Sequence, residues 1–137
     1  MANTADPQPG ARARVLVVDD EPDIVFLLKH LLESAGFDVH ETTTGQEAVE
    51  LATRDSQHPF EVVVLDVTMP DIDGVSVAVD LRACDGCRRT RIVFHTALDE
   101  TYVRSRFAAY DGFLAKPVQS RDLVDCVSRL AASAREH

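Results

Sequence analysis

Several features that define other classes of protein are missing from this 137-residue chain. No apolar run approaches the roughly 20 residues that a membrane-spanning helix needs. The N-terminal segment lacks the basic start and the apolar middle of a signal peptide. Cysteine is scarce, and its odd count of three does not predict a framework of disulfides. Together these absences predict a cytoplasmic protein.

Basic residues are also in the minority. Lys and Arg number 14 against 23 Asp and Glu, so the net charge is -9, and no basic stripe is visible. This balance predicts no direct contact between this domain and nucleic acid, although a role in a regulatory pathway stays open. No Gly-x-Gly-x-x-Gly motif follows the first apolar run, and no glycine-rich loop ends in Lys-Ser/Thr. The sequence therefore argues against a dinucleotide-binding domain.

Enough apolar residues are present, at 45%, to build one folded domain with a real core. Residues 1–13 hold two Pro, one Gly and mostly small or polar side chains, which predicts a disordered tail. The remaining residues, 14–135, form the predicted domain.

Five short apolar runs alternate with five stretches of helical pattern in that domain. The predicted strands cover 14–19, 37–40, 62–65, 92–94 and 113–115, and the predicted helices cover 23–35, 45–54, 74–83, 99–109 and 120–135. Strict alternation of strands and helices is typical of a doubly wound α/β domain with a parallel sheet. The run at 37–40 alternates apolar and polar residues, so we place it at an edge of the sheet.

The first predicted helix carries clear boundary signals. Pro22 suits the first turn, where its missing N–H matters little, and Gly36 suits a left-handed C-cap. Apolar residues recur between them at helical spacing, which predicts one stripe that packs on the sheet: Ile24, Leu27, Leu28, Leu31 and Leu32.

Polar side chains follow four of the predicted strands. They are Asp19 and Asp20, Asp66, Thr96, and Lys116. Taken alone, Asp66 could be a polar residue that merely ends a strand. However, the carboxyl ends of parallel strands lie on one edge of a sheet, so these side chains are expected to converge. That convergence predicts a ligand site.

Three carboxylates at one edge repel one another, by roughly 4 kcal/mol for a pair at 4 Å and an effective dielectric of 20. The cluster of Asp19, Asp20 and Asp66 therefore needs a cation, and carboxylate oxygens with water suit Mg²⁺, which is often shared with phosphate. The hydroxyl of Thr96 and the ammonium of Lys116 could then hold the oxygens of a phosphoryl group on Asp66.

Four motifs at these strand ends give the chain a resemblance to the receiver domains of response regulators, of the CheY-like kind. The motifs are Val17-Val-Asp-Asp-Glu-Pro22, Leu65-Asp-Val-Thr-Met-Pro70 with Asp73-Gly74, Thr96-Ala97, and Phe113-Leu-Ala-Lys-Pro117. The resemblance covers about residues 14–135. It implies a flavodoxin-like (βα)5 fold with a five-stranded parallel sheet of order 2-1-3-4-5.

The resemblance also implies a phosphorylation site and a metal site. Asp66 matches the phosphoacceptor of the family. Asp20 and Asp66 would bind Mg²⁺ directly, Asp19 would act through water or by positioning, and Thr68 would offer its backbone carbonyl. A protein of this kind is a phosphoacceptor that assists its own phosphorylation and dephosphorylation, and not an enzyme in the ordinary sense.

Three further positions match the switching machinery of the family. Thr96 and Phe113 match the switch hydroxyl and the switch aromatic, and Lys116 would pair with the phosphoryl group. The bond between Lys116 and Pro117 is expected to be cis. Phosphorylation would reshape the face formed by helix 99–109, strand 113–115 and helix 120–135.

The implied partners are a sensor histidine kinase or a phosphotransfer protein, which donates the phosphoryl group, and a downstream protein target. Because the chain ends soon after the last predicted helix, we expect a single-domain regulator. The alternatives are the receiver fragment of a larger regulator and a phosphorylation-independent interaction module. The oligomeric state, a monomer or a phosphorylation-linked dimer, stays open.

Two departures from the family pattern bear on function. Ala109-Tyr110 stands where Gly-Ala usually closes the fourth helix, and the segment is slightly short, so we expect a short or mobile helix and an atypical partner surface. The positions two residues after Asp66 and Thr96 are Thr68 and Leu98. Neither can hold an attacking water with a carboxylate or an amide, so we expect slow self-dephosphorylation.

Two other families with related chemistry fit less well. A haloacid-dehalogenase-like hydrolase needs a second Asp two residues after the nucleophile, and Thr68 occupies that position. A flavodoxin-like redox carrier needs a phosphate-binding loop after the first strand, where Asp19, Asp20 and Glu21 would repel a phosphate.

Cys84 and Cys87 have the C-x-x-C spacing of a redox pair or of half a zinc site. No second C-x-x-C and no paired His motif complete a zinc site, so we interpret them as free thiols in a loop. Cys126 falls among apolar residues at helical spacing and is predicted to be a core residue.

Overall fold

Five parallel strands form a single sheet in the computed structural model of the chain, which describes residues 12–54 and 58–135. The strands are β1 (Arg14–Val18), β2 (Asp38–Thr42), β3 (Val62–Leu65), β4 (Arg91–Thr96) and β5 (Gly112–Ala115). Their order across the sheet is β2-β1-β3-β4-β5, which confirms the predicted order and the edge position of β2.

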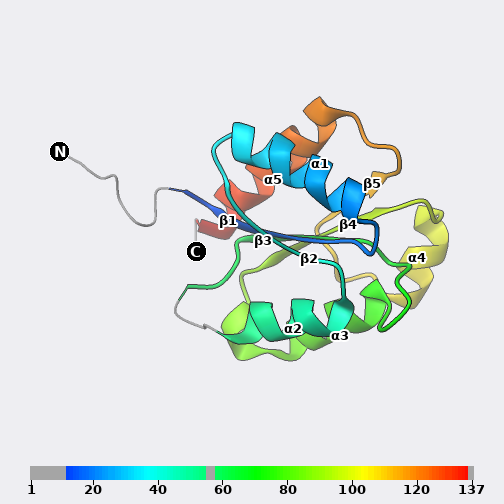
Figure 1. Cartoon of the computed structure of the whole chain (residues 1–137). Helices are drawn as coiled ribbons and strands as arrows, with labels where there is room; N and C mark the ends of the chain where they lie inside the picture. The colour runs from blue at the N-terminus through cyan, green and yellow to red at the C-terminus, as the bar shows by residue number, and fades with distance from the viewer. Residues whose placement is uncertain (1–11, 55–57, 136–137) are drawn as a thin grey trace.

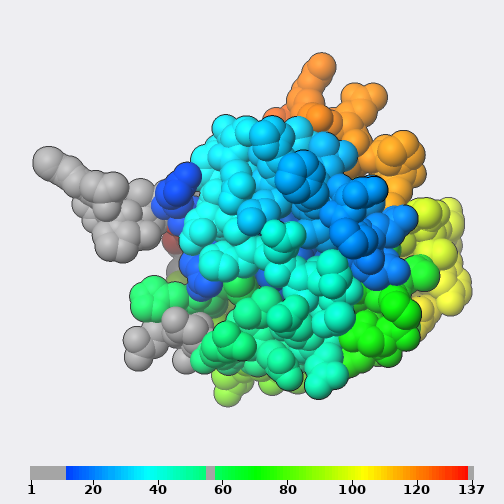
Figure 2. Space-filling view, viewed as in Figure 1, coloured from blue at the N-terminus to red at the C-terminus, as the bar shows by residue number. Residues whose placement is uncertain are grey.

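Helices cover both faces of this sheet (Figure 1). On one face lie α1 (Pro22–Ser34) and α5 (Ser120–Arg135), and on the other lie α2 (Gly45–Arg54) and α3 (Gly74–Ala83). The short helix α4 (Glu100–Arg106) precedes the edge strand β5, and a 3-10 turn, η2 (Asp85–Cys87), follows α3. In the space-filling view, α1 (blue) lies above and α2 (teal) lies below the edge of the sheet that faces the viewer (Figure 2).

The central strands lack an alternating pattern because both of their faces are buried. In β1, Val15 and Val17 pack with residues of α1 and α5, whereas Leu16 and Val18 pack with residues of α2 and α3. All four side chains are at most 1% exposed. Such burial on both faces fixes the strands firmly, and therefore fixes the positions of the residues that follow them.

The helix α1 has the predicted boundaries to within one residue, and Gly36 has the expected left-handed conformation, with φ at 99°. The predicted apolar stripe is only partly correct. Val25, Leu28 and Leu32 face the sheet, whereas Leu27 is 50% exposed. Leu27 lies about 100° around the helix from Leu28, which takes it outside the narrow contact face.

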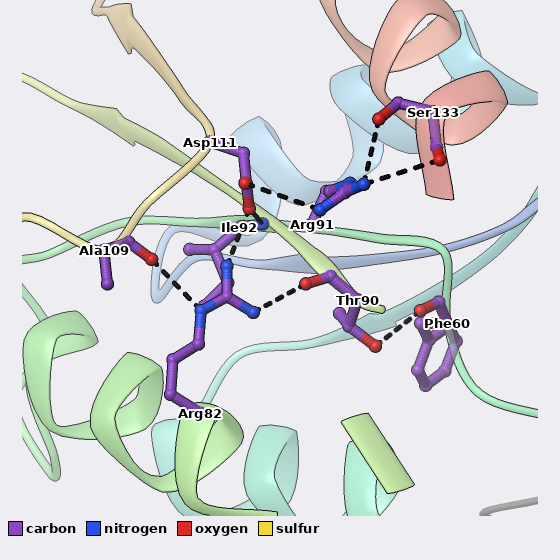
Figure 3. A network of polar contacts seen from close by, with 8 residues as sticks. All are labelled: Phe60, Arg82, Thr90, Arg91, Ile92, Ala109, Asp111 and Ser133. Carbon is purple, nitrogen blue, oxygen red and sulfur yellow. Dashed lines mark hydrogen bonds and ion pairs between the residues drawn. The ribbon is translucent and has the colours of Figure 1, made fainter. Parts of the chain in front are cut away.

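The helix α4 is short, as expected from Ala109-Tyr110. It ends at Arg106, before the end of the predicted range of 99–109, and Phe107 has extended backbone angles. Arg82, from α3, accounts for this end (Figure 3). Its Nε donates to the carbonyl of Ala109 at 3.1 Å, and its Nη2 lies 2.7 Å from the carboxylate of Asp111. These contacts hold the α4–β5 loop in an extended form where the helix would otherwise continue.

The predicted tail at residues 1–13 lies outside the described residues except for Arg12 and Ala13. Ala13 is buried, and its carbonyl accepts a hydrogen bond from the backbone N–H of Asp38 at 2.9 Å. The packed part of the chain therefore begins before Arg14. Within the described residues, we find no helix with the length and apolar character that crossing a membrane requires.

Candidate functional site

The parallel register brings the polar residues after β1, β3, β4 and β5 to one edge of the sheet. Val18 pairs with Leu65, and Leu65 pairs with Phe94. The backbone hydrogen bonds between strands continue past these pairs. The N–H of Asp66 donates to the carbonyl of Val18 at 3.0 Å, and the N–H of Lys116 donates to the carbonyl of Thr96 at 2.9 Å. The backbones of Asp66, Thr96 and Lys116 are thus held by the sheet itself.

The amine of Lys116 lies at the centre of this cluster. Its Nζ is 2.7 Å from Oδ2 of Asp19, 2.9 Å from Oδ2 of Asp66 and 3.6 Å from Oε1 of Glu21. Burial alone would lower the pKa of Lys116, but hydrogen bonds and charges from Asp19 and Asp66 outweigh it and raise the pKa. Lys116 is therefore a firmly charged ammonium between two carboxylates.

The carboxylates outnumber this ammonium. Asp19 is fully buried, Asp66 is 5% exposed and Asp20 is half-buried. One oxygen from each of the three lies within 4.8 Å of the others. A single ammonium leaves two excess negative charges among these three residues, so the donor set of closely spaced carboxylate oxygens fits a small divalent cation such as Mg²⁺.

The loops after β1 and β3 fix the direction of each buried carboxylate. Oδ1 of Asp66 accepts a hydrogen bond from the N–H of Thr68 at 3.2 Å, and Oδ1 of Asp19 accepts one from the N–H of Glu21 at 3.0 Å. Gly74 allows the turn after β3 to close tightly, because a Cβ at this position would collide with the carbonyl of Asp66. The other oxygen of each carboxylate is left facing Lys116.

Thr96 and Phe113 lie on neighbouring strands near this edge. Thr96 is 1% exposed, and its hydroxyl oxygen accepts a hydrogen bond from the N–H of Leu98 at 3.3 Å. Phe113 is half-buried beside Tyr110, with ring centroids 6.2 Å apart, and Tyr110 in turn lies 5.4 Å from the ring of Phe94. The peptide bond between Lys116 and Pro117 is cis.

Two residues of this region were not predicted as site residues. Glu21, in the loop after β1, lies close to Lys116. In the sequence, only its position next to Asp19 and Asp20 indicated that it could belong to the site. His95 is 3% exposed, and neither ring nitrogen has a hydrogen-bond partner among the described residues. Burial and the charge of Lys116 lower the pKa of His95, against opposing effects of Asp19 and Asp66. The ring is therefore neutral at physiological pH.

Comparison with known proteins places this arrangement in a family. Residues 15–128 match the response regulator receiver domain. The chain is 37% identical over 112 residues to the transcriptional regulatory protein SrrA of Staphylococcus aureus. This match covers 80% of the chain but 44% of SrrA, so the chain spans less than half the length of the curated relatives that it matches.

Solved structures agree with this assignment. The chemotaxis protein CheY4 of Vibrio cholerae has a TM-score of 0.81 and 28% identity, covering 88% of this chain and 99% of CheY4. The response regulator TrrA of Thermotoga maritima, solved in complex with Mg(2+)-BeF, has a TM-score of 0.76 and 30% identity, covering 86% of this chain and 98% of TrrA. The chain belongs to the response regulator receiver domain family of two-component systems.

Proposed function

We propose that this receiver domain accepts a phosphoryl group on Asp66 from the phosphohistidine of a sensor histidine kinase or a phosphotransfer protein, in a reaction that requires Mg²⁺. One observation carries the proposal. The buried carboxylate of Asp66 lies 2.9 Å from the amine of Lys116 and within 4.8 Å of the oxygens of Asp19 and Asp20. A nucleophile, a fixed positive charge and a set of oxygen ligands for a cation therefore meet at one point.

The chemical step is a transfer between two side chains. An oxygen of Asp66 forms a bond to phosphorus while the bond from phosphorus to the histidine nitrogen of the donor breaks, and that nitrogen keeps the electron pair. Lys116 pairs with the phosphoryl oxygens. Mg²⁺ would be held by Asp20, Asp66 and the backbone carbonyl of Thr68, with Asp19 acting through water or by positioning, and would neutralise further charge on those oxygens.

The switch that follows would start at Thr96. Its hydroxyl would leave the N–H of Leu98 and donate to a phosphoryl oxygen, and Phe113 would move into the space that becomes available. The half-buried ring of Phe113, which lies beside Tyr110 and follows a short α4, supports this movement because it is not locked in the core. The face formed by α4, β5 and α5 would then change shape and bind a different downstream protein.

The test is phosphorylation by acetyl phosphate with Mg²⁺, followed by intact mass. We expect the mass of one added phosphoryl group, lost in Asp66→Ala and after removal of Mg²⁺ with EDTA. Asp122→Ala, which removes an exposed carboxylate at the start of α5, is the matched control and should still be phosphorylated. An unmodified wild-type chain would instead support a phosphorylation-independent interaction module.

The phosphoryl group should be long-lived. The side chain of Thr68 is exposed and Leu98 is apolar, so neither can orient an attacking water with a carboxylate or an amide. We therefore propose slow self-dephosphorylation compared with chemotaxis-type relatives. A decay of the phosphorylated mass within seconds in Mg²⁺ would contradict this.

The proposal concerns the receiver domain alone. SrrA is named a transcriptional regulatory protein, but the chain spans 44% of its length. We propose that the described domain itself does not bind DNA, because its sequence has a net charge of -9 and no basic stripe. A mobility shift of a mixed-sequence duplex by the isolated chain at physiological salt would contradict this.

A further inference from the structure

A pair of thiols lies at the C-terminal end of α3, apart from the cluster around Asp66. Cys84 caps α3 and is half-buried, whereas Cys87 lies in η2 and is 1% exposed. Both are free thiols, as expected, although Cys87 belongs to the core and not to a loosely packed loop. We propose that Cys84 and Cys87 are a modification site that forms a reversible internal disulfide when a thiol oxidant such as hydrogen peroxide reaches Cys84.

The backbone between the two residues already has a suitable shape. The N–H of Cys87 donates to the carbonyl of Cys84 at 3.0 Å, which closes a turn from residue i to residue i+3. Such turns keep the two Cα atoms within about 7 Å, and disulfides join Cα atoms that are about 4.4–6.8 Å apart. Bond formation therefore needs rotation of the side chains more than movement of the chain.

The two thiols have different roles in the reaction. Burial, with a smaller contribution from Cys84, raises the pKa of Cys87 to about 12, so Cys87 is not the first to react. The half-buried Cys84 attacks an oxygen of the peroxide, which gives a sulfenic acid and one water. The sulfur of Cys87 then attacks the sulfur of Cys84, and a second water leaves. Two thiols are thus oxidised by two electrons as one peroxide is reduced to two waters.

The surroundings of Cys87 oppose a permanent bond. Its Sγ donates to the buried carbonyl of Ala52 at 3.3 Å, and oxidation removes this donor. Loss of this hydrogen bond destabilises the oxidised form relative to the reduced form. The disulfide should therefore be reduced readily, as a reversible modification requires.

The pair also lies beside the contacts that fix the α4–β5 loop. Arg82, two residues before Cys84 on α3, binds the carbonyls of Ala109 and Thr90 and the carboxylate of Asp111 (Figure 3). A covalent bond at the end of α3 is thus placed next to the segment that leads into β5.

The experiment treats the reduced chain with hydrogen peroxide, then alkylates the remaining thiols under denaturing conditions and measures the intact mass. We expect the oxidised chain to stay monomeric, to be lighter by two hydrogens before alkylation, and to have one alkylatable thiol in place of three. Dithiothreitol should restore all three thiols. Cys126→Ser should lose both of its remaining thiols. Cys126 is a matched control, because it is buried in the opposite layer with α5.

Two further variants test the pairing. Cys84→Ser and Cys87→Ser should form no internal disulfide. Oxygen adducts or covalent dimers through Cys84, with Cys87 still open to alkylation after denaturation, would overturn the proposal. Asp66→Ala should form the disulfide as the wild type does, so failure here is distinguishable from failure of the phosphoryl-transfer proposal.

Discussion

Two clusters of charge lie at opposite ends of β4, and they differ in how their charges are balanced. At the carboxyl end, Lys116 is the ammonium between the buried carboxylates of Asp19 and Asp66. At the amino end, the carboxylate of Asp111 lies between the guanidinium groups of Arg82 and Arg91, at 2.7 and 3.9 Å (Figure 3). The first cluster has an excess of acid and the second has an excess of base.

The two clusters differ in whether groups of the protein itself satisfy their excess charge. All three side-chain nitrogens of Arg82 have an acceptor, two of them backbone carbonyls, so its charge is already satisfied within the protein. The excess carboxylates near Lys116 have oxygens within 4.8 Å of one another and need an outside cation. The contacts of Arg82 are completed by the chain and stabilise the fold, although Nε of Arg91 has no hydrogen-bond partner among the described residues. The acidic cluster, in contrast, can bind a cation.

The largest effect is expected from Lys116→Met. It removes the ammonium and leaves two buried carboxylates uncompensated, which should lower the free energy of unfolding by about 3 kcal/mol without metal. Mg²⁺ should restore much of this loss, because the cation takes over the charge. Urea unfolding with and without Mg²⁺ measures both effects. Equal losses in the two conditions would contradict the view that this cluster binds a cation.

Asp111→Ala should have the next largest effect, and Mg²⁺ should not relieve it. The variant leaves Nη2 of Arg82 and the N–H of Ile92, which is 2.8 Å from the carboxylate, without their acceptor. We expect a loss of about 2 kcal/mol in the free energy of unfolding. Phosphorylation by acetyl phosphate should proceed as in the wild type. Asp111→Asn is the control, because it keeps an acceptor for one of the two donors and should lose less.

This comparison also shows what the sequence could and could not predict. Asp66 and Lys116 could be predicted to meet, because apolar runs without alternation indicated buried parallel strands and their ends share one edge. A short α4 was expected from Ala109-Tyr110, but its end at Arg106 could not be predicted, since Ala108 and Ala109 favour a helix and the extended loop depends on a hydrogen bond from Arg82, 27 residues before Ala109. Long-range side-chain contacts of this kind leave no local pattern.

Within the site, the contacts of Glu21 and His95 could not be predicted from the sequence either. Both residues follow or end a predicted strand, so their position at the edge of the sheet could be predicted. Their contacts depend on the direction of each side chain, which only the packed structure gives. For His95, alternation along β4 places it on the face of Val93, away from Phe94, and this signal could have identified it as a neighbour of Asp66.

A smaller effect is expected from His95→Leu, which tests the edge of the acidic cluster. The two buried ring nitrogens, which have no partner in the described part of the chain, destabilise the fold, so the variant should be more stable at pH 7.5 by about 1 kcal/mol. The pKa of His95 is lowered, so the unfolded chain takes up a proton at a higher pH than the folded chain does. Wild-type stability should therefore fall as the pH falls below about 6.5, by up to about 1.4 kcal/mol per pH unit.

The measurement is urea unfolding of wild type and His95→Leu between pH 7.5 and 5.5. The difference between the two proteins isolates His95 from Asp19, Asp66 and Lys116, which face it and are present in both. We expect that the variant gains stability relative to wild type as the pH falls through this window. A difference that does not change with pH would mean that the ring finds a partner for its proton in the folded state.

The smallest effect is expected from Tyr110→Phe, which tests a third group of polar contacts, on the face formed by α4, β5 and α5. The hydroxyl of Tyr110 donates to Glu100 at 2.6 Å and accepts from Arg104 at 3.2 Å, but both partners are exposed to solvent. Water can replace such contacts, so the free energy of unfolding should change by less than about 0.5 kcal/mol. Phosphorylation of Asp66 should not change.

Tyr110→Ala separates the hydroxyl from the ring. It removes the aromatic group that lies between Phe94 and Phe113, so its loss of stability should clearly exceed that of Tyr110→Phe. The same urea unfolding experiment compares the two variants. If both lost equal stability, the polar contacts of Tyr110 with α4 would hold this face together. The ring of Tyr110 would then add nothing measurable to the stability of the face formed by α4, β5 and α5, although it lies between Phe94 and Phe113.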